Sequence, residues 1–474
     1  MVGAGMRNIL SQIFRLLVRE VRVPIVGALI AASVGLGYVH VSSVDTGEYT
    51  SPRQINVVQC IGWKEASSKV AQRIYMSNGN SASAVDLVIN GRATTLKAQQ
   101  ALSQDITSGA GVSVISEGEG SNALATTIVA RSKDQVASGV AADTCRAPND
   151  EWWFTGIRTL SGFSAKLLLA NPDNADAIVA LAAYSQDGEL QVGQFRRVLV
   201  PANKVRLVDL TQAIPGVSTA SIRVHAVEGR ITPSLQTEVL SGEKKLGRTF
   251  IAPITDVSNT AVISGVRGNS QKQQLVLMPT AEDAIVTVKI HSSDGSFILA
   301  GAENVLAPKQ VPMIFDLSSA ITGSDVGIEV VADQPVIAAV RGFEKVGKAL
   351  DYEVVASQPA MKSSVIALAI SAMNKNVFSA LSLNDATVRV VAIVGGKISW
   401  TQELTLTAGV FQHLKLQETV DPRTMLIFRS SDPGVYISQT MIGSVGSTPQ
   451  TSVLGLVDPI TQIVEGVRLH LQVS

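Results

Sequence analysis

The sequence predicts an all-β protein in which tandem immunoglobulin-like β-sandwich modules follow one N-terminal transmembrane helix. Three observations carry this prediction: an uncharged apolar stretch near the N-terminus, short alternating strands between turn residues, and an internal repeat with a constant offset. At 474 residues the chain is too long for one ordinary domain, and its length suggests three or four domains. Lys plus Arg equals 39 and Asp plus Glu equals 39, so we expect no nucleic-acid partner, which would require a basic surface.

The apolar stretch covers residues 23–41, reads VPIVGALIAASVGLGYVHV and contains no Asp, Glu, Lys or Arg. A membrane-spanning helix needs about 20 such residues. Because Arg15, Arg19 and Arg22 precede the stretch, the N-terminus is predicted to be cytoplasmic and the rest of the chain extracytoplasmic. A cleavable signal peptide is the alternative, but its apolar region is usually shorter and ends in a small-residue cleavage pattern that is missing here.

The residues ahead of the predicted anchor have a pattern of their own. Leu10, Phe14 and Leu17 recur at helical spacing, while the arginines gather on another face. This pattern is typical of a basic amphipathic helix that lies on the inner leaflet. Continuation of the membrane helix into the cytoplasm explains it equally well.

The internal repeat is visible in two long phrases, ANPDNADAIVALAAYSQDG at 170–188 and MPTAEDAIVTVKIHSSDG at 278–295. Pro172 and Pro279 lie 107 positions apart (279 − 172), and so do Asp187 and Asp294 (294 − 187). A repeat of this length is too long for a solenoid or propeller unit of about 20–50 residues, so each copy is predicted to be a domain. Residues 379–416 keep the same order of features and are predicted to be a third, divergent copy.

Each copy consists of short runs rich in Val, Leu and Ile, separated by Asn, Pro, Asp and Gly at the spacing of an antiparallel β-sandwich. Residues 55–148 alternate in the same way. The predicted organisation is therefore a basic cytoplasmic amphipathic segment (1–22), a transmembrane anchor (23–41), a tether (42–54), an N-terminal β module (55–149), β-sandwich repeat 1 (150–252), repeat 2 (253–360) and the divergent repeat 3 (361–474).

The alternation also predicts which side chains form the core of the repeats. In repeat 1 these are Leu167, Leu169, Val179 and Leu181. The offset of 107 (279 − 172) maps them to the following residues of repeat 2: Gln274, Val276, Val286 and Val288. Gln274 is the polar exception, and we expect it at a strand edge where its amide reaches water.

The two cysteines, Cys60 and Cys145, both fall on the predicted outer side of the membrane. In an oxidising compartment such a pair is expected to form a disulfide, with two buried, reduced thiols as the alternative. Neither cysteine has a second Cys or a His at the spacing of metal ligands, so we expect no metal site.

One stretch is a distinctive candidate for a binding site, EWWFTG at 151–156. Trp152 and Trp153 there are predicted to form either a glycan contact, by stacking on a sugar ring, or a contact between modules, with at least one of them in the core. The five histidines are scattered, and no nucleophile elbow or phosphate-binding loop is present. We therefore predict no catalytic residues and no cofactor, and read NPDNADA around Asp173 as a turn rather than a calcium loop.

Two cysteine-centred stretches, VVQCIGW around Cys60 and CRAPNDEWWFTG from Cys145, lead into the first repeat phrase. Over roughly residues 20–350 this combination resembles an uncharacterised actinobacterial family, a domain of unknown function found in single-pass cell-envelope proteins with extracytoplasmic β modules. That family often has Pro-Gly after the first cysteine, where this chain has Ile61-Gly62. The resemblance implies a location in the cell envelope and brings no known activity or site residues.

Taken together, these observations predict a membrane-anchored extracytoplasmic structural or interaction protein of the cell envelope, without catalytic activity. Its partners are predicted to be the membrane, through the N-terminal helix, and another envelope protein. The alternative function is binding of a cell-wall glycan, with an enzyme whose site is not recognisable from the sequence ranked last.

Overall fold

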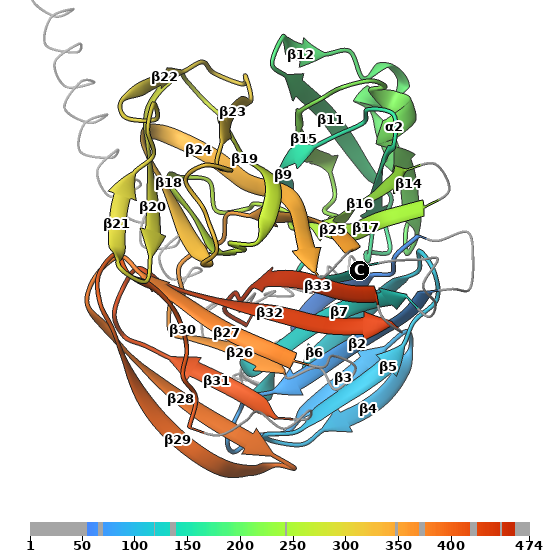
Figure 1. Ribbon diagram of the computed structural model, residues 1–474. Coiled ribbons are helices and arrows are strands. Elements are labelled where there is room, and N and C mark those ends of the chain that lie inside the picture. Colours follow the sequence, from blue (N-terminus) through green and yellow to red (C-terminus); the bar gives the residue numbers. More distant parts are fainter. Residues whose placement is uncertain are drawn as a thin grey trace, which may run out of the picture. The chain divides into compact units, whose positions relative to one another are not determined.

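The computed structural model describes residues 55–64, 70–117, 119–132, 139–241, 244–346, 349–368, 375–417, 424–445 and 448–459. These residues form an all-β fold of several small sheets, as predicted (Figure 1). The predicted cytoplasmic segment, anchor and tether lie outside the described residues. Within the described part of the chain, no helix has the length and apolar character needed to cross a membrane.

The N-terminal module contains two antiparallel sheets that share one hydrophobic core. Its strands are β1 (Ile55–Ile61), β2 (Val70–Asn78), β3 (Val85–Ile89), β4 (Arg92–Leu96), β5 (Ala101–Asp105), β6 (Gly111–Glu117), β7 (Leu124–Ser132) and β8 (Val140–Thr144). The sheet orders are β1-β6-β3-β4 and β5-β2-β7-β8. In β3 the burial alternates residue by residue, which places Leu87 in the core as the sequence pattern predicts.

Repeat 1 is built in the same way. Its strands are β9 (Glu151–Ile157), β10 (Phe163–Ala170), β11 (Ala177–Ser185), β12 (Gly188–Leu190), β13 (Val198–Val200), β14 (Val205–Asp209), β15 (Ala220–Glu228), β16 (Thr232–Ser241) and β17 (Lys244–Ile251). The sheet orders are β12-β11-β15-β9 and β14-β10-β16-β17. A single helical turn, α2 (Leu210–Ala213), follows β14, and the Asp209 carboxylate caps it by accepting a hydrogen bond of 3.0 Å from Thr211 N.

Repeat 2 joins its strands into one 8-stranded sheet. They are β18 (Ser258–Val266), β19 (Ser270–Pro279), β20 (Ala284–Ser292), β21 (Gly295–Ile298), β22 (Val305–Ala307), β23 (Met313–Asp316), β24 (Val326–Val346) and β25 (Ala349–Ala356). The cause is β24, whose first part pairs with β18 and β20 and whose second part pairs with β19 and β25. In repeat 1 the corresponding chain is interrupted between β15 and β16 at Gly229, which has a φ of +74°.

Repeat 3 again has two 4-stranded sheets. Its strands are β26 (Ser364–Leu368), β27 (Lys375–Ser382), β28 (Ala386–Val394), β29 (Lys397–Leu406), β30 (Phe411–His413), β31 (Met425–Arg429), β32 (Val435–Val445) and β33 (Thr448–Gly455). The orders are β26-β31-β28-β29 and β30-β27-β32-β33.

One strand order therefore recurs along the chain. In the N-terminal module, in repeat 3 and, leaving out the short β13, in repeat 1, the first strand pairs with the sixth, the sixth with the third and the third with the fourth. The other sheet joins the fifth, second, seventh and eighth strands. The N-terminal module thus shares the order of the repeats, which its sequence does not reveal. Every sheet takes its strands from one predicted module; whether each module folds alone stays a prediction.

The predicted core of repeat 1 agrees with the structure. Leu167, Leu169, Val179 and Leu181 are all buried in one cluster. In repeat 2 the mapping holds for β20, because Val286 and Val288 are both buried in its core.

On β19 the mapping is wrong by one residue. Leu275 and Leu277 occupy the core of repeat 2, not Gln274 and Val276. Lys166 and Gln274 lie opposite the equivalent Asp209 and Asp316, which makes the offset on this strand 108 (274 − 166). Because side chains alternate between the two faces of a strand, a shift of one residue turns each of them to the other face.

The position of Gln274 also corrects the prediction. It does not lie at a strand edge, because β19 pairs with β23 on one side and with β24 on the other. Instead of facing water, its side-chain oxygen accepts hydrogen bonds of 2.6 Å from Arg158 and 3.0 Å from Arg341.

A truncation on β20 tests the core of repeat 2. We expect Val286→Ala to lower the free energy of unfolding by about 1–3 kcal/mol, because its fully buried side chain leaves a cavity. The neighbouring Ile285 is 41 % exposed on the other face, so Ile285→Ala is the matched control and should cost less than about 0.5 kcal/mol. Urea denaturation of both variants measures the difference, and equal losses would contradict the assigned register.

The last strands of the four modules contact one another in a closed cycle: β8 with β17, β17 with β25, β25 with β33, and β33 with β8. Polar contacts join them. Ala142 N donates to Ser452 Oγ over 3.2 Å, and Thr451 N donates to Asp351 Oδ2 over 2.9 Å. The first and last modules are therefore direct neighbours, although they stand at opposite ends of the described chain.

Apolar packing follows the same cycle. Phe250 of repeat 1 belongs to the core of the N-terminal module, and Ala339 of repeat 2 belongs to that of repeat 1. Val453 of repeat 3 is buried in the core of repeat 2, and Val140 of the N-terminal module in that of repeat 3. Each neighbouring pair of modules is thus held by buried side chains, which stabilise the cycle by the hydrophobic effect.

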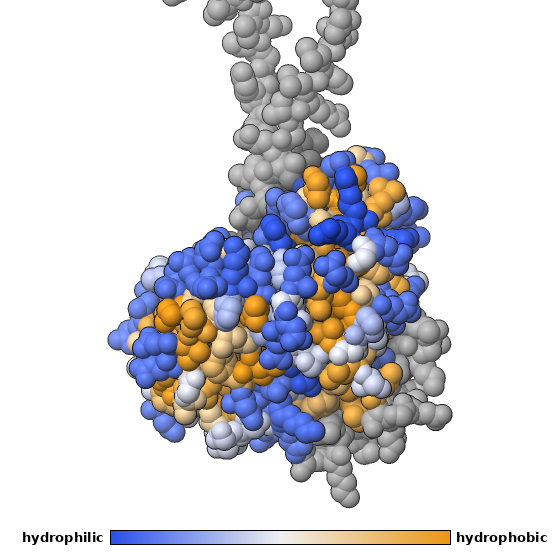
Figure 2. All heavy atoms as spheres, turned by 90° about the horizontal axis from the view of Figure 1, so that it is seen from above, coloured by the Kyte–Doolittle hydropathy of each residue, from blue (hydrophilic) through white to orange (hydrophobic). Residues whose placement is uncertain are grey.

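The surface keeps one apolar pair in both full repeats. Ile178 lies opposite Leu199, and Ile285 lies opposite Leu306. Leu199 and Leu306 are 107 positions apart (306 − 199), and they are 55 % and 58 % exposed. The face shown in Figure 2 likewise carries groups of apolar side chains between hydrophilic ones. Such groups mark surfaces that bind partners when they are contiguous.

Candidate functional site

A cavity of about 230 Å³ lies where the last strands of the four modules meet. Each strand contributes to its lining: Ala142 from β8, Phe250 from β17, Val354 from β25 and Leu454 from β33. Gln358 adds a buried amide, whose nitrogen donates to Ile437 O over 3.0 Å. Ligand pockets usually enclose about 300–1,000 Å³, so this cavity is small for one. We interpret it as a feature of the joint between the modules.

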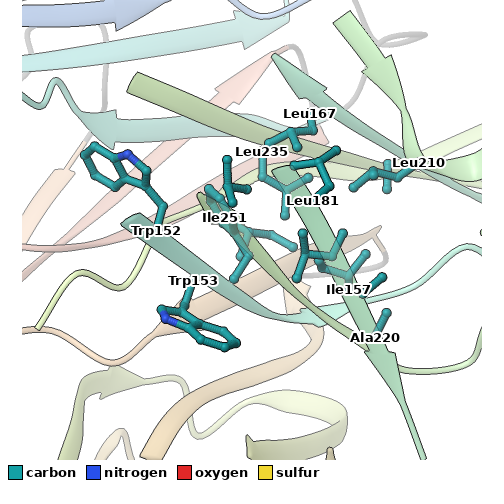
Figure 3. Close-up of a cluster of buried hydrophobic side chains, with 14 of the residues drawn as sticks. Trp152, Trp153, Ile157, Leu167, Leu181, Leu210, Ala220, Leu235 and Ile251 are labelled. Atoms are coloured by element: carbon teal, nitrogen blue, oxygen red, sulfur yellow. The ribbon is translucent and has the colours of Figure 1, made fainter. Parts of the chain in front are cut away.

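Trp152 and Trp153 point to opposite sides of β9, and both side chains are buried (Figure 3). Trp152 lines the central cavity, and its indole nitrogen donates to Ile231 O over 3.1 Å. Trp153 donates to Glu151 Oε1 over 2.9 Å and stacks on Tyr184 at a centroid distance of 6.2 Å. Neither ring is exposed at the outer surface, where a sugar chain could stack on it. Their assignment to glycan or inter-module contact stays a prediction, and the burial favours the inter-module contact.

Cys60 and Cys145 form the predicted disulfide. It joins β1 to the residue that follows β8, and the two cysteines are 85 positions apart. Both residues are buried, and Cys145 also lines the central cavity. The bridge therefore fixes one of the four strands that close the cycle.

A second, larger cleft of about 750 Å³ lies between repeat 2 and repeat 3. Arg267 and Asp325 line it from repeat 2, and His413 and Lys415 from repeat 3. Asp325 accepts hydrogen bonds from Arg267 Nη1 and, over 2.9 Å, from Gly268 N. In the sequence the five histidines are scattered and do not indicate this site. Its residues come together only when repeat 2 packs against repeat 3.

One group in this region resembles a nucleophilic triad in composition. Ser379 Oγ lies 2.8 Å from His413 Nδ1, and His413 Nε2 lies 3.4 Å from Asp325 Oδ2. A nucleophilic serine has to reach its substrate. The Ser379 side chain is buried and does not line the cleft, so in this structure its hydroxyl serves to orient the imidazole.

His291 bridges the same two repeats at a different place. Its Nδ1 lies 3.0 Å from Gly409 O, and its Nε2 lies 3.2 Å from Glu329 Oε2. Lys289 Nζ lies 3.3 Å from the same carboxylate oxygen. Burial raises the pKa of the Glu329 carboxyl, but the hydrogen bond from His291 and the charges of Lys289 and His291 outweigh it, so the pKa lies below its ordinary value.

This carboxylate predicts a dependence of stability on pH. Because the pKa of Glu329 is lower in the folded chain than its unfolded value of about 4.3, its contribution is present above about pH 4.3 and is lost as the pH falls through the folded-state pKa. We expect Glu329→Gln to lower the free energy of unfolding by about 1–3 kcal/mol at neutral pH. The difference from the wild type should shrink on acidification.

Urea denaturation between about pH 7 and pH 3 measures this effect. Glu282, whose side chain is 71 % exposed and pairs with Lys309, provides the control. Glu282→Gln should change stability by less than about 0.5 kcal/mol across the range. If both variants lose stability equally, the role of the buried carboxylate is contradicted.

Arg341 forms a buried polar joint between repeats 1 and 2. Its guanidinium donates to Ser218 O over 3.2 Å and to Thr219 Oγ1 over 2.7 Å, as well as to Gln274. Burial, together with the charge of Arg158, lowers the pKa of Arg341 to about 10. In the sequence this residue is one of many arginines, and no motif distinguishes it.

Metal-binding side chains do not gather in groups of three or more anywhere in the described ranges. The site thus consists of a small central cavity, a cleft lined by both apolar and charged side chains, and buried joints between β modules. The class of protein that these features define is a multi-module β protein with a cleft between modules.

The chain belongs to a family of unknown function, DUF5719, whose match covers residues 101–417. No curated protein matches the chain.

Several solved structures show a weak similarity. The tetra-tandem repeat in the extending region of a large adhesion protein is 11 % identical, with 85 % of this chain and 99 % of that chain covered, at a TM-score of 0.10. An anti-sigma factor domain-containing protein from Clostridium clariflavum is 9 % identical, with 78 % and 94 % covered, at a TM-score of 0.09. Scores this low carry no argument about the fold or function of this chain.

Proposed function

We propose that this chain is a membrane-anchored, extracytoplasmic structural or interaction protein of the cell envelope, with no catalytic role. Residues 23–41 are its single membrane anchor, and its modules are tandem immunoglobulin-like sandwiches that stand outside the membrane. The resemblance to an actinobacterial family of envelope proteins supports the location, as does the disulfide, since disulfides persist in oxidising compartments.

The observation that carries an interaction function is the exposed apolar pair that both full repeats retain. The two repeats are not identical, because β19 is shifted by one residue at Gln274 and Val276. Leu199 and Leu306 nevertheless occupy the same position of their repeats, and both side chains are more than half exposed. An exposed leucine is ordinary by itself. Its recurrence at one repeat position, opposite an isoleucine each time, favours a surface that contacts another protein.

Cross-linking in intact cells tests this proposal. The wild-type chain should be recovered with defined protein partners, and Leu199→Glu combined with Leu306→Glu should lose them. Ile398 is 58 % exposed on β29 of repeat 3, so Ile398→Glu is a control with the same exposure as Leu306. Recovery of the same partners with the double variant, or of none with the wild type, would overturn the proposal.

The location is tested separately. Protease added to intact cells should cleave the β modules while the residues before the anchor stay protected. Membrane fractions should retain the full chain after washing with high salt. A chain that is released by salt, or that is cleaved only after lysis, would contradict the single-pass topology.

A further inference from the structure

The cleft between repeats 2 and 3 has the size of a ligand site. Its volume of about 750 Å³ lies inside the usual range of about 300–1,000 Å³, unlike the central cavity. It is lined by the β29–β30 region of repeat 3 on one side, with His413 and Lys415, and by Arg267 and the turn at Asp325 of repeat 2 on the other. Clefts at the contact of two domains are a frequent place for ligands.

The charges that line this cleft do not balance. Asp325 is the one acidic residue among those that the structure describes around it, against the two cations Arg267 and Lys415. The Asp325 carboxylate is already bonded to Arg267 and to Gly268 N. Lys415 is exposed, and within the described ranges no acidic side chain forms an ion pair with it. An excess of positive charge in a concave site attracts an anion.

Local contacts position the His413 imidazole and the backbone that carries Lys415. The imidazole of His413 lies 2.8 Å from Ser379 Oγ and packs edge-on against Phe411 at a centroid distance of 5.9 Å. Gln402 Nε2 donates to Lys415 O over 2.9 Å, which fixes the backbone that carries the lysine. A site whose donors are positioned in advance loses less entropy on binding.

The lining also offers neutral hydrogen-bonding groups, beside the apolar Leu404, Val410, Phe411 and Leu414. Ser293, Ser324, Thr405 and Gln412 contribute hydroxyl and amide groups. Such groups recognise the hydroxyls of a sugar or polyol, whereas the cations recognise a carboxylate or phosphate. We propose that this cleft binds an anionic, hydroxyl-rich chain, such as an acidic polysaccharide or a polyol phosphate polymer. This ligand site goes beyond the interaction function and does not use the exposed leucine pair.

Binding to the purified full-length chain in detergent micelles tests the proposal, measured by isothermal titration calorimetry. Three probes of similar length separate the chemistries: trigalacturonate for carboxylates, a short glycerol phosphate oligomer for phosphates, and neutral maltotriose. At least one anionic probe should bind, and its affinity should fall as salt is added. The tighter of the two anionic probes identifies the source of the anion. Equal binding of maltotriose, or binding of neither anionic probe, overturns the proposal.

Variants locate the site. Lys415→Gln combined with His413→Gln should weaken binding of the anionic probe at least about tenfold, since the first change removes a charge-assisted contact and the second removes a hydrogen-bonding imidazole from the lining. Lys397 is an exposed lysine on β29 that does not line the cleft, so Lys397→Gln should leave the affinity unchanged. Lys415→Gln alone keeps the test valid if the double variant is unstable, because the Lys415 side chain is exposed. Unchanged affinity in the Lys415 variant overturns the assignment to this cleft.

Discussion

Replacing Gly247 by alanine is expected to destabilise the described unit by more than about 4 kcal/mol, beyond the range of most single substitutions. Gly247 lies on β17 with a φ of +139°, and an added Cβ would lie 2.1 Å from Tyr352 N and 2.6 Å from Asp351 Oδ1. The nearest atom belongs to the backbone of β25, which cannot move aside unless β17 and β25 separate. The substitution should therefore open the cycle of terminal strands.

Gly188→Ala is the control for this prediction. Gly188 also has a positive φ, +101°, but nothing lies within 4 Å of its added Cβ. It therefore measures the conformational cost alone, about 1–3 kcal/mol. Urea denaturation of the full-length chain, followed by tryptophan fluorescence, compares the two variants. A loss for Gly247→Ala no larger than for Gly188→Ala would show that β17 and β25 do not meet this closely.

Loss of the Cys60–Cys145 disulfide is expected to have the second large effect, about 2–5 kcal/mol. The bridge closes a loop between cysteines that are 85 positions apart, so its removal restores much conformational freedom to the unfolded chain. Urea denaturation with and without reductant measures the change in the wild type.

The double variant Cys60→Ser and Cys145→Ser should match the reduced wild type, and reductant should not alter it further. Mass spectrometry without reduction should find the linked peptide in protein taken from intact cells. Two free thiols there, or a wild type that reductant leaves unchanged, would contradict both the bridge and the predicted outer location.

Much of the fold could be predicted from the sequence because alternation and turns act locally. The alternation along β10 and β11 identified Leu167 and Val179 as core residues, and both are buried. The sequence does not identify the N-terminal module as a further copy. It has the strand order of the repeats but lacks the turn residues, such as Pro172 of repeat 1, by which the copies are recognised. The error on β19 has another cause. A register shift of one residue leaves the alternation around Leu275 intact but moves each side chain to the other face of the sheet.

The site was much less predictable, because it depends on contacts between modules. His413 and Asp325 stand 88 positions apart (413 − 325), and only the packing of repeat 3 on repeat 2 brings them together. Alternation along β9 correctly placed one tryptophan in the core. It could not show that Tyr184 covers Trp153 on the other face, since a single strand carries no information about the neighbours of its sheet.

The contact between β8 and β33 has a consequence for how the protein is made. The bond from Ala142 N to Ser452 Oγ joins residues 310 positions apart. A ribosome adds about 5–20 residues per second, so roughly 15–60 seconds pass between the synthesis of the two partners. Throughout that time the nascent chain exposes Val140 and Ala142, which the last module later buries. A polypeptide released before β33 is complete therefore keeps the apolar edge of β8 uncovered. Such an edge favours aggregation and recognition by quality-control proteases.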